Sequence, residues 1–135
     1  MRVVFDANIL IAAFMFRGGM AEQAMQQVLD GYDDLLISRP LITEVLGVLG
    51  RKFGADREEL SRLAVFLSEV GVMVSPELTL TVLQDEPDNR ILEVAVEGRA
   101  DLIVTGDKKM LKLMRYDAVR ILSLRAYLEL AGGLG

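Results

Sequence analysis

Acidic side chains are the residues of this sequence most capable of chemistry. Asp6 and Asp107 each follow a short apolar run of the kind that forms a buried strand. Asp88 stands at the start of an expected helix, and Glu44 lies inside another. Carboxylate oxygens are the ligands that hard divalent cations such as Mg²⁺ and Mn²⁺ prefer. The four residues therefore predict a metal site if the fold brings them together.

Two residue types that often carry catalysis are missing. The chain of 135 residues has no histidine and no cysteine, which excludes Ser-His-Asp triads, thiolate nucleophiles, disulfides and the usual zinc sites. Any acid–base or metal chemistry therefore depends on carboxylates. The formal net charge of −5 argues against broad non-specific binding to nucleic acid, which relies on lysine and arginine. Such binding would need a local basic patch and a metal.

The pattern of apolar residues predicts the elements that position these acids. Strands alternate with helical segments, which implies right-handed crossovers and a parallel α/β sheet with helices on both faces. In such sheets ligands bind outside the carboxyl ends of the strands, where Asp6 and Asp107 stand. Asp56 and Glu59 predict a capping box before one helix. The expected strands are 2–5, 34–37, 71–74, 101–104 and 119–122, and the expected helices include 21–29, 60–70 and 91–96.

Length and composition predict a single domain over residues 1–130. Hydrophobic residues make up 52% of the chain, which is enough for one core. Residues 131–135 are expected to form a flexible tail, because Ala-Gly-Gly-Leu-Gly offers little to bury. No apolar run is long enough to span a membrane, and the start lacks the features of a signal peptide. We therefore expect a soluble, cytoplasmic protein.

A purely structural role is the alternative for the aspartates. Aspartate at a junction between strand and helix commonly caps the helix, a contribution of about 1 kcal/mol. For Asp88 taken alone, capping is the favoured interpretation. Asp6 differs, because the apolar segment 9–14 that follows it would bury the start of its helix beside the sheet. A functional role is favoured for Asp6.

Glu44 is the most anomalous acid, because its neighbours at helical spacing are apolar. Leu41, Val45 and Val48 place its carboxylate within an apolar stripe. A buried carboxylate needs a cation, a hydrogen-bond donor or a proton. A salt bridge to lysine or arginine is one solution. Metal ligation is favoured because three other acids are placed to converge with it.

Near the third expected helix, the run Asp85-Glu86-Pro87-Asp88 places three acids around a proline. A solvated turn explains at least one of Asp85 and Glu86. Asp88 is the preferred site residue because it lies nearest the helix that it would cap.

Basic residues near the acids could hold a phosphate backbone. Lys108, Lys112 and Arg115 are predicted to share one face of a helix after Asp107. A solvated surface face is the alternative interpretation. Arg17, beside a pair of glycines, could also contact a substrate.

Taken together, the spacing of these residues resembles that of the PIN-domain family over nearly the whole chain. The similarity is closest to prokaryotic, VapC-like toxins of toxin–antitoxin pairs. The matching features are Asp6-Ala7-Asn8, Ser38 followed by Glu44, Asp88-Asn89 with Ala95, and the run Ile103-Val104-Thr105-Gly106-Asp107.

This resemblance implies both a fold and an activity. The fold would be a three-layer α/β/α sandwich with a five-stranded parallel sheet in the order 3-2-1-4-5. The activity would be Mg²⁺- or Mn²⁺-dependent hydrolysis of single-stranded RNA by metal-activated water, leaving 5′-phosphate and 3′-hydroxyl ends. An antitoxin partner and a homodimer are also implied. Catalysis and metal binding would fall to Asp6, Glu44, Asp88 and Asp107, supported by Asn8 and Thr105.

Two other functions fit parts of the sequence. An aspartyl phosphotransferase of the haloacid-dehalogenase type would use Asp6 as its nucleophile, but Asn8 and Leu10 depart from that pattern. A non-catalytic module that binds RNA or protein would keep the fold and use its acids as helix caps. A phospho-acceptor domain fits less well, because Asn8 interrupts the expected acidic pair.

Overall fold

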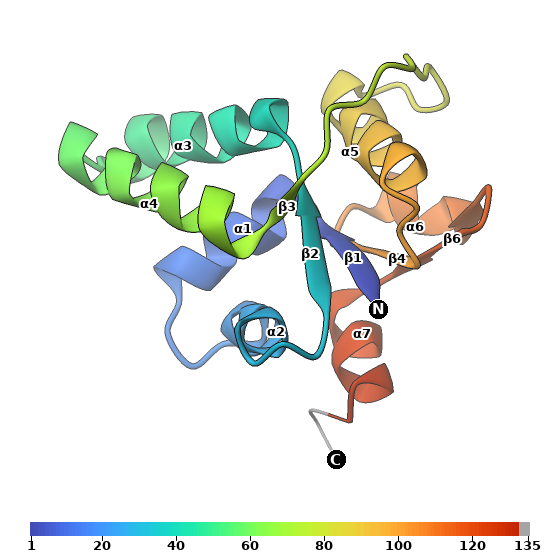
Figure 1. Ribbon diagram of the computed structural model, residues 1–135, viewed down its shortest axis with the longest axis horizontal. Coiled ribbons are helices and arrows are strands. Elements are labelled where there is room, and N and C mark those ends of the chain that lie inside the picture. The colour runs from blue at the N-terminus through green and yellow to red at the C-terminus, as the bar shows by residue number, and fades with distance from the viewer. Residues whose placement is uncertain (133–135) are drawn as a thin grey trace.

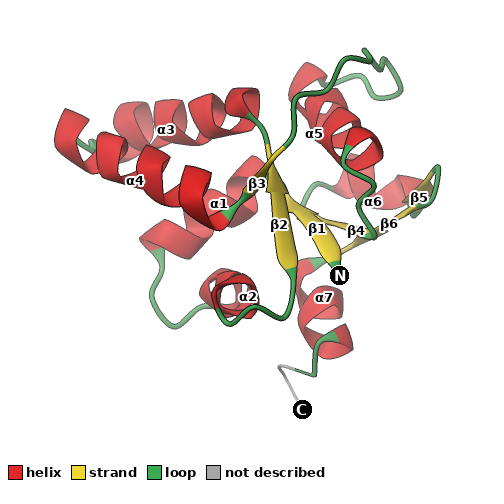
Figure 2. Cartoon of the chain, in the orientation of Figure 1, coloured by secondary structure: helices red, strands yellow, loops and turns green. Residues whose placement is uncertain are grey.

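The structure of the protein, a computed structural model, describes residues 1–132. Six strands form one central sheet in the order β3-β2-β1-β4-β6-β5, and Figure 2 shows this sheet surrounded by helices. Neighbouring strands are parallel except for β5 and β6, which are antiparallel. The strands are β1 (Arg2–Phe5), β2 (Asp34–Ile37), β3 (Val72–Met73), β4 (Leu102–Val104), β5 (Arg115–Tyr116) and β6 (Val119–Leu122).

The predicted α/β fold and strand order are confirmed, but the predicted number of five strands is wrong. The five expected strands correspond to β1, β2, β3, β4 and β6, and they follow the order predicted for them. The additional strand, β5, lies at the edge of the sheet and reaches β6 through a turn at Asp117, where φ is 54°. The pair Arg115-Tyr116 is not part of an apolar run, and Arg115 is predicted to lie on a helix, so the sequence pattern does not predict β5.

Helices cover both faces of the sheet (Figure 1). Helix α5 packs against β1, β2 and β4, whereas α2 contacts α1 and α7. Helices α3 and α4 pack against each other and extend away from the sheet as a pair (Figure 1). Within residues 1–132, no helix has the length and apolar character needed to cross a membrane. The helices are α1 (Ala7–Met15), α2 (Met20–Leu29), α3 (Arg39–Phe53), α4 (Arg57–Val70), α5 (Glu86–Glu97), α6 (Lys108–Leu113) and α7 (Leu124–Leu130).

The two central strands explain why the site forms where it does. Val3, Val4 and Phe5 of β1 are fully buried, and the residues of β4 are almost fully buried, as expected for strands that are covered on both faces. Because β1 and β4 are parallel neighbours, their carboxyl ends lie side by side. The residues that follow them, Asp6 and the segment 105–107, are therefore brought to one edge of the sheet.

Local signals for the helix ends are largely confirmed. The Asp56 carboxylate accepts a hydrogen bond from the Glu59 amide at 2.8 Å, and the Glu59 carboxylate accepts one from the Asp56 amide at 3.3 Å, which completes the predicted capping box. Helix α7 ends at Leu130. The predicted tail begins after it, and residues 133–135 of that tail lie outside the described part of the chain.

Replacing two glycines with alanine should change the stability of the fold in opposite directions. A Cβ at Gly71 would lie 2.6 Å from Ile37 Cγ2 and 3.0 Å from the Leu67 carbonyl oxygen, whereas at Gly50, inside α3, it would meet Leu60 Cδ1 at 3.4 Å. We expect Gly71→Ala to lower the free energy of unfolding by about 1–3 kcal/mol through overpacking. Gly50→Ala should raise it by up to about 1 kcal/mol, because alanine favours a helix interior. Urea unfolding measures both, and equal effects would contradict this account of the packing.

Candidate active site

All four predicted acids line one small pocket at the carboxyl edge of the sheet. The pocket has a volume of about 50 Å³. Four separate elements supply the acids: the end of β1, helix α3, the first turn of α5 and the loop after β4. The lining residues are Asp6, Ala7, Asn8, Glu44, Pro87, Asp88, Ile91 and Asp107.

Asp6 is the most deeply buried of the four, with 6% of its surface exposed. Its Oδ1 accepts a hydrogen bond from the Ile9 amide at 3.0 Å and so caps α1. Its Oδ2 accepts a hydrogen bond from the Thr105 hydroxyl. That hydroxyl oxygen in turn accepts a bond from the Asp107 amide at 3.0 Å. Asp6 is thus both a helix cap and a site residue, and buried Thr105 links the ends of β1 and β4.

Asp107 is also a helix cap and a member of the pocket. One of its oxygens accepts hydrogen bonds from the amides of Lys109 and Met110, at 2.8 and 3.4 Å, at the start of α6. Asp107 also offers an oxygen that lies within 4.8 Å of oxygens from Asp85 and Asp88. The sequence presents helix capping and a functional role as alternatives, but the Asp107 carboxylate both caps α6 and lines the acidic pocket.

For Asp88, the capping interpretation is wrong. Helix α5 begins two residues earlier, at Glu86, with Asp85 in the capping position, and Pro87 lies in its first turn. Proline is tolerated there because its fixed φ suits the first turn and no amide is needed. Asp88 Oδ2 is buried and has no hydrogen-bond partner among the described residues. An unpartnered carboxylate oxygen at this position fits a bound cation.

Glu44 reaches the pocket from α3 and is half-buried. The alternative of a salt bridge is not borne out, since no ion pair within residues 1–132 includes Glu44. Burial raises the pKa of Glu44, and the negative charge of Asp6 raises it further. The anomaly seen in the sequence therefore persists in the structure as a partly desolvated carboxylate that pairs with no lysine or arginine of the described residues.

The acids perturb one another's protonation. Burial raises the pKa of Asp6, although hydrogen bonds from Thr105 and nearby amides work against the rise. Burial, the hydrogen bond with Asp107 and the surrounding negative charges raise the pKa of Asp88 to about 7. Asp107 is itself partly desolvated, but hydrogen bonds with Asp88 and with the amides of α6 hold its pKa below the ordinary value. In the metal-free site Asp88 is therefore the acid that holds a proton as pH falls below about 7, while Asp107 stays ionised.

The donor set of this pocket suits a hard divalent cation. Its possible ligands are carboxylate oxygens, which Mg²⁺ and Mn²⁺ prefer. A bound cation would stabilise the ionised forms of Asp6, Glu44 and Asp88 and so lower their raised pKa values. It would also give a partner to Asp88 Oδ2, which has none among the described residues.

Sequence reasoning left the role of Asp85 open and missed Lys109, and both residues lie beside the pocket. Asp85 offers an oxygen to the cluster with Asp88 and Asp107. Lys109 places its Nζ 4.0 Å from the Asp85 carboxylate. The charges around Pro87 and after Asp107 were visible in the sequence, but their relative positions depend on where α5 and α6 begin. Glu86, by contrast, pairs with Arg90 on the same helix, at 2.9 Å.

The predicted phosphate-binding residues are exposed but do not form one helical face. Lys108 and Lys112 lie on α6. Arg115 belongs to β5 instead, because the helix ends at Leu113 and Met114 takes a φ of 60°. Arg17 lies beyond the C-terminal end of α1, about 13 Å along that nine-residue helix from its start at Asp6.

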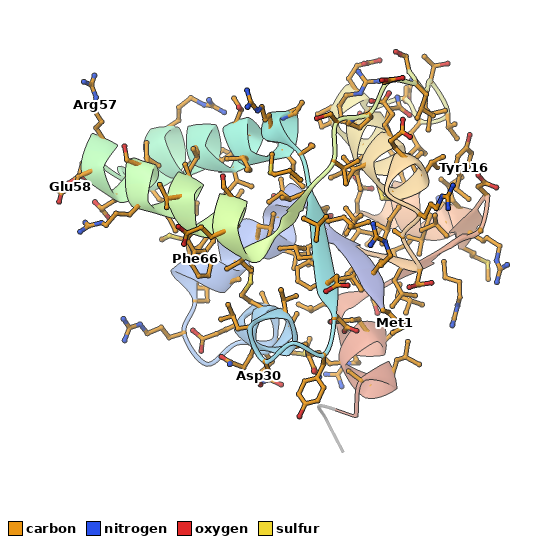
Figure 3. The ribbon with its side chains drawn as sticks, in the orientation of Figure 1. Met1, Asp30, Arg57, Glu58, Phe66 and Tyr116 are labelled. Carbon is orange, nitrogen blue, oxygen red and sulfur yellow. The ribbon has the colours of Figure 1, made fainter. Side chains whose placement is uncertain are left out.

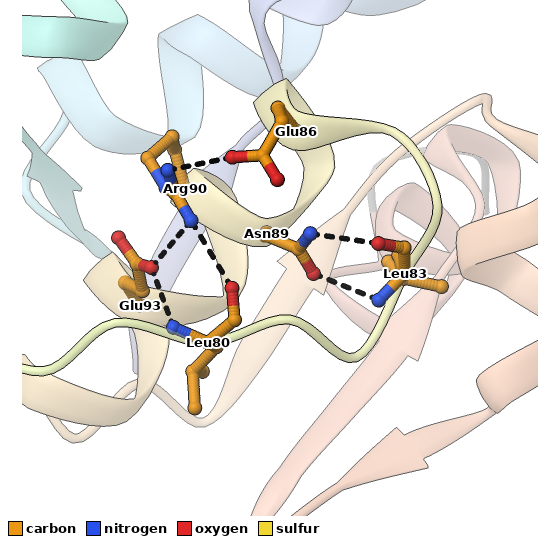
Figure 4. Close-up of polar contacts among 6 residues, drawn as sticks. All are labelled: Leu80, Leu83, Glu86, Asn89, Arg90 and Glu93. Atoms are coloured by element: carbon orange, nitrogen blue, oxygen red, sulfur yellow. Dashed lines mark hydrogen bonds and ion pairs between the residues drawn. The ribbon is translucent and has the colours of Figure 1, made fainter.

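An extended segment before α5 holds that helix in place (Figure 4). The Asn89 side chain accepts a hydrogen bond from the Leu83 amide at 2.8 Å and donates one to the Leu83 carbonyl at 2.7 Å. One helical turn later, the Glu93 carboxylate accepts a bond from the Leu80 amide at 2.7 Å. These contacts tie α5, whose first turn carries Asp88, to the extended segment that precedes it.

Known proteins match the stretch of chain that carries the acids. The family model described as "PIN domain" matches residues 2–109. The protein is also similar to "Uncharacterized protein MJ1680" of Methanocaldococcus jannaschii, with 27% identity over 116 residues. That alignment covers 83% of this chain and 74% of the archaeal protein. The range matched by the family model, residues 2–109, includes Asp6, Glu44, Asp88 and Asp107.

The raised pKa of Asp88 predicts how pH changes stability in the absence of metal. A carboxyl group whose pKa is higher in the folded protein favours folding below its ordinary pKa of 3.8, and that benefit is lost as pH rises through about 7. We therefore expect Asp88→Asn to raise the thermal midpoint of EDTA-treated protein by several degrees at pH 8 and to change it little at pH 4, near the ordinary pKa. Scanning calorimetry at both values tests this. A lower midpoint for the variant at pH 8 would refute the assignment.

Proposed function

The chain belongs to the PIN-domain family, a family of metal-dependent nucleases, and we propose that it is a divalent-metal-dependent endoribonuclease that cleaves single-stranded RNA. The observation that carries this proposal is the convergence of Asp6, Glu44, Asp88 and Asp107 on one pocket with an unpartnered buried oxygen. We assign metal binding and catalysis to these four acids, with Mg²⁺ or Mn²⁺ as the cofactor.

The chain's own residues would prepare the site for hydrolysis. Thr105 holds Asp6 and the Asp107 backbone in register, and the α1 and α6 amides fix one oxygen of each aspartate. Both Asp6 oxygens therefore accept a hydrogen bond, and the lone pairs that remain on these carboxylates would serve the pocket, where Asn8 adds a polar group. A divalent cation at such a site supplies polarisation of the phosphodiester and a lower pKa for the attacking water.

Exposed lysine and arginine side chains around the pocket favour a polyanionic substrate. Lys108 and Lys112 follow Asp107 on α6, and Lys109 lies beside Asp85. We assign phosphate contacts to Lys108, Lys112 and Arg115, with Arg17 as a more distant contact. Their local positive charge would offset the repulsion between phosphates and a chain whose net charge is −5.

The proposed biological role is that of the toxin in a toxin–antitoxin pair. This role, an antitoxin partner that covers the acidic pocket, and a homodimer all come from the resemblance of the acidic motifs to such toxins. Growth arrest on expression of the wild-type protein, relieved by Asp6→Asn, would support the toxin role.

Asp6→Asn is the primary test of the nuclease. Asparagine keeps an oxygen that can cap α1 but removes the negative charge, so we expect metal binding to weaken and RNA cleavage to fall to background. Isothermal titration with Mg²⁺ and Mn²⁺, together with cleavage of single-stranded RNA on the same samples, measures both effects. Single-stranded DNA of the same sequence tests the preference for RNA.

Asp30→Asn is the matched control for that experiment. Asp30 lies beside α2, far from α5 (Figure 3), and asparagine can keep its hydrogen bond from Gln26. Full cleavage should therefore remain in this variant. Retained Mg²⁺-dependent cleavage in Asp6→Asn would contradict the assignment. RNA binding without metal and without cleavage in the wild type would favour the binding module instead.

The link through Thr105 makes a second prediction. Thr105→Val removes the hydroxyl at nearly constant volume, and Thr105→Ser keeps it. Loss of a hydrogen bond that orients a metal ligand commonly weakens metal affinity by about 10–100-fold. We expect a loss of that size in the valine variant and near-normal affinity in the serine variant. Mn²⁺ titration measures both, and equal affinities would show that the hydroxyl does not orient Asp6.

A further inference from the structure

A second and larger pocket adjoins the acidic one. Its volume is about 280 Å³, near the lower end of the range for small-molecule sites. Glu44, Pro87 and Ile91 line both pockets, so the two share a wall. The larger pocket is lined by Pro40, Leu41, Glu44, Glu86, Pro87, Arg90 and Ile91.

Two helix starts form the walls of this second pocket. Pro40 lies in the first turn of α3, and Pro87 lies in the first turn of α5. Leu41 and Ile91 are the buried apolar residues between them. A pocket with mainly apolar walls, placed directly beside a cluster of acids, is poorly suited to a phosphate group and well suited to an uncharged ring.

Arg90 supplies a planar group to the same pocket (Figure 4). Its guanidinium donates to Glu86 at 2.9 Å, to Glu93 at 2.8 Å and to the Leu80 carbonyl at 3.1 Å. Guanidinium hydrogen bonds lie in the plane of the group. These contacts therefore hold Arg90 in place without using its flat faces, and its side chain is 36% exposed. Nucleobases stack on such faces.

We propose that this pocket is a nucleobase subsite, which holds one base of the RNA strand next to the phosphodiester at the acidic pocket. The proposal rests on the proposed function and deepens it. A backbone phosphate would lie at the acids, while the attached base would enter the neighbouring pocket between the prolines and stack on Arg90. A base that is not paired can turn out of the stack of its neighbours and enter the pocket while it stays attached to its strand, which agrees with a single-stranded substrate.

A double-mutant cycle that combines a protein variant with an altered RNA tests the subsite. Single-stranded RNAs carrying one abasic ribonucleotide, placed in turn on either side of the scissile phosphate, are compared with the intact RNA. Each is cleaved by the wild type and by Arg90→Lys, which keeps the charge but removes the flat face. Arg62→Lys is the matched control, because Arg62 forms a similar ion pair with Glu58 on the exposed surface of α4.

We expect one abasic position to lower kcat/KM by about tenfold, the order expected for one lost stacking contact. Arg90→Lys should lower kcat/KM comparably on intact RNA but cause little further loss on that abasic RNA. A merely structural effect of Arg90→Lys would lower cleavage of both RNAs equally and would overturn the proposal. Insensitivity of the wild type to every abasic position would also overturn it.

A binding measurement separates this proposal from the nuclease assignment. The four nucleoside 5′-monophosphates and ribose 5-phosphate are titrated into ¹⁵N-labelled wild-type protein. We expect at least one nucleotide, but not ribose 5-phosphate, to shift the amide signals of Leu41, Arg90 and Ile91. If the protein cleaves no RNA but these signals shift, the nuclease fails and the subsite stands. If no nucleotide shifts them, the subsite fails whatever the activity.

Discussion

Crowding of partly desolvated carboxylates is the constraint that organises this protein around its acidic pocket. Four acids from four elements line about 50 Å³, and burial, together with the neighbouring acids, raises the pKa of Asp88 to about 7. Such crowding disfavours the metal-free fold at neutral pH, so the surroundings must hold the acids in place. The Thr105 hydroxyl, which joins Asp6 to the Asp107 backbone, is the central contact in that arrangement.

The N-terminal ends of helices also help to stabilise the acidic pocket. Asp6 and Asp107 each use an oxygen to cap a helix, so the amides that need an acceptor also stabilise the negative charge. Asp88 lies in the first turn of α5, where a negative charge is favourable, but its Oδ2 has no hydrogen-bond partner within residues 1–132. The structural and functional roles of these aspartates are thus compatible, because a carboxylate that accepts one or two hydrogen bonds keeps lone pairs for a ligand.

The contacts of α5 connect the acidic pocket with its apolar neighbour. Asn89 and Glu93 hold the extended segment at Leu83 and Leu80, which positions the helix start that carries Asp88. Arg90 lies between them in the sequence and lines the larger pocket while it bonds to the same segment. One helix therefore positions a candidate metal ligand and a candidate stacking surface together.

The sequence by itself determined the α/β class and the places of the main strands, because a buried parallel strand has a continuous apolar pattern. The strand order and the set of four acids came from the resemblance of the motifs to the PIN-domain family. Only the tertiary structure decided the contacts across the site. Asp88 lies two residues inside its helix rather than at its start, Arg115 leaves the helix of Lys112, and Asp85 joins the cluster. These differences have one physical cause. Apolar periodicity reports which face of an element is buried, whereas the residue at which a helix begins or ends depends on backbone angles and packing with elements distant in the chain.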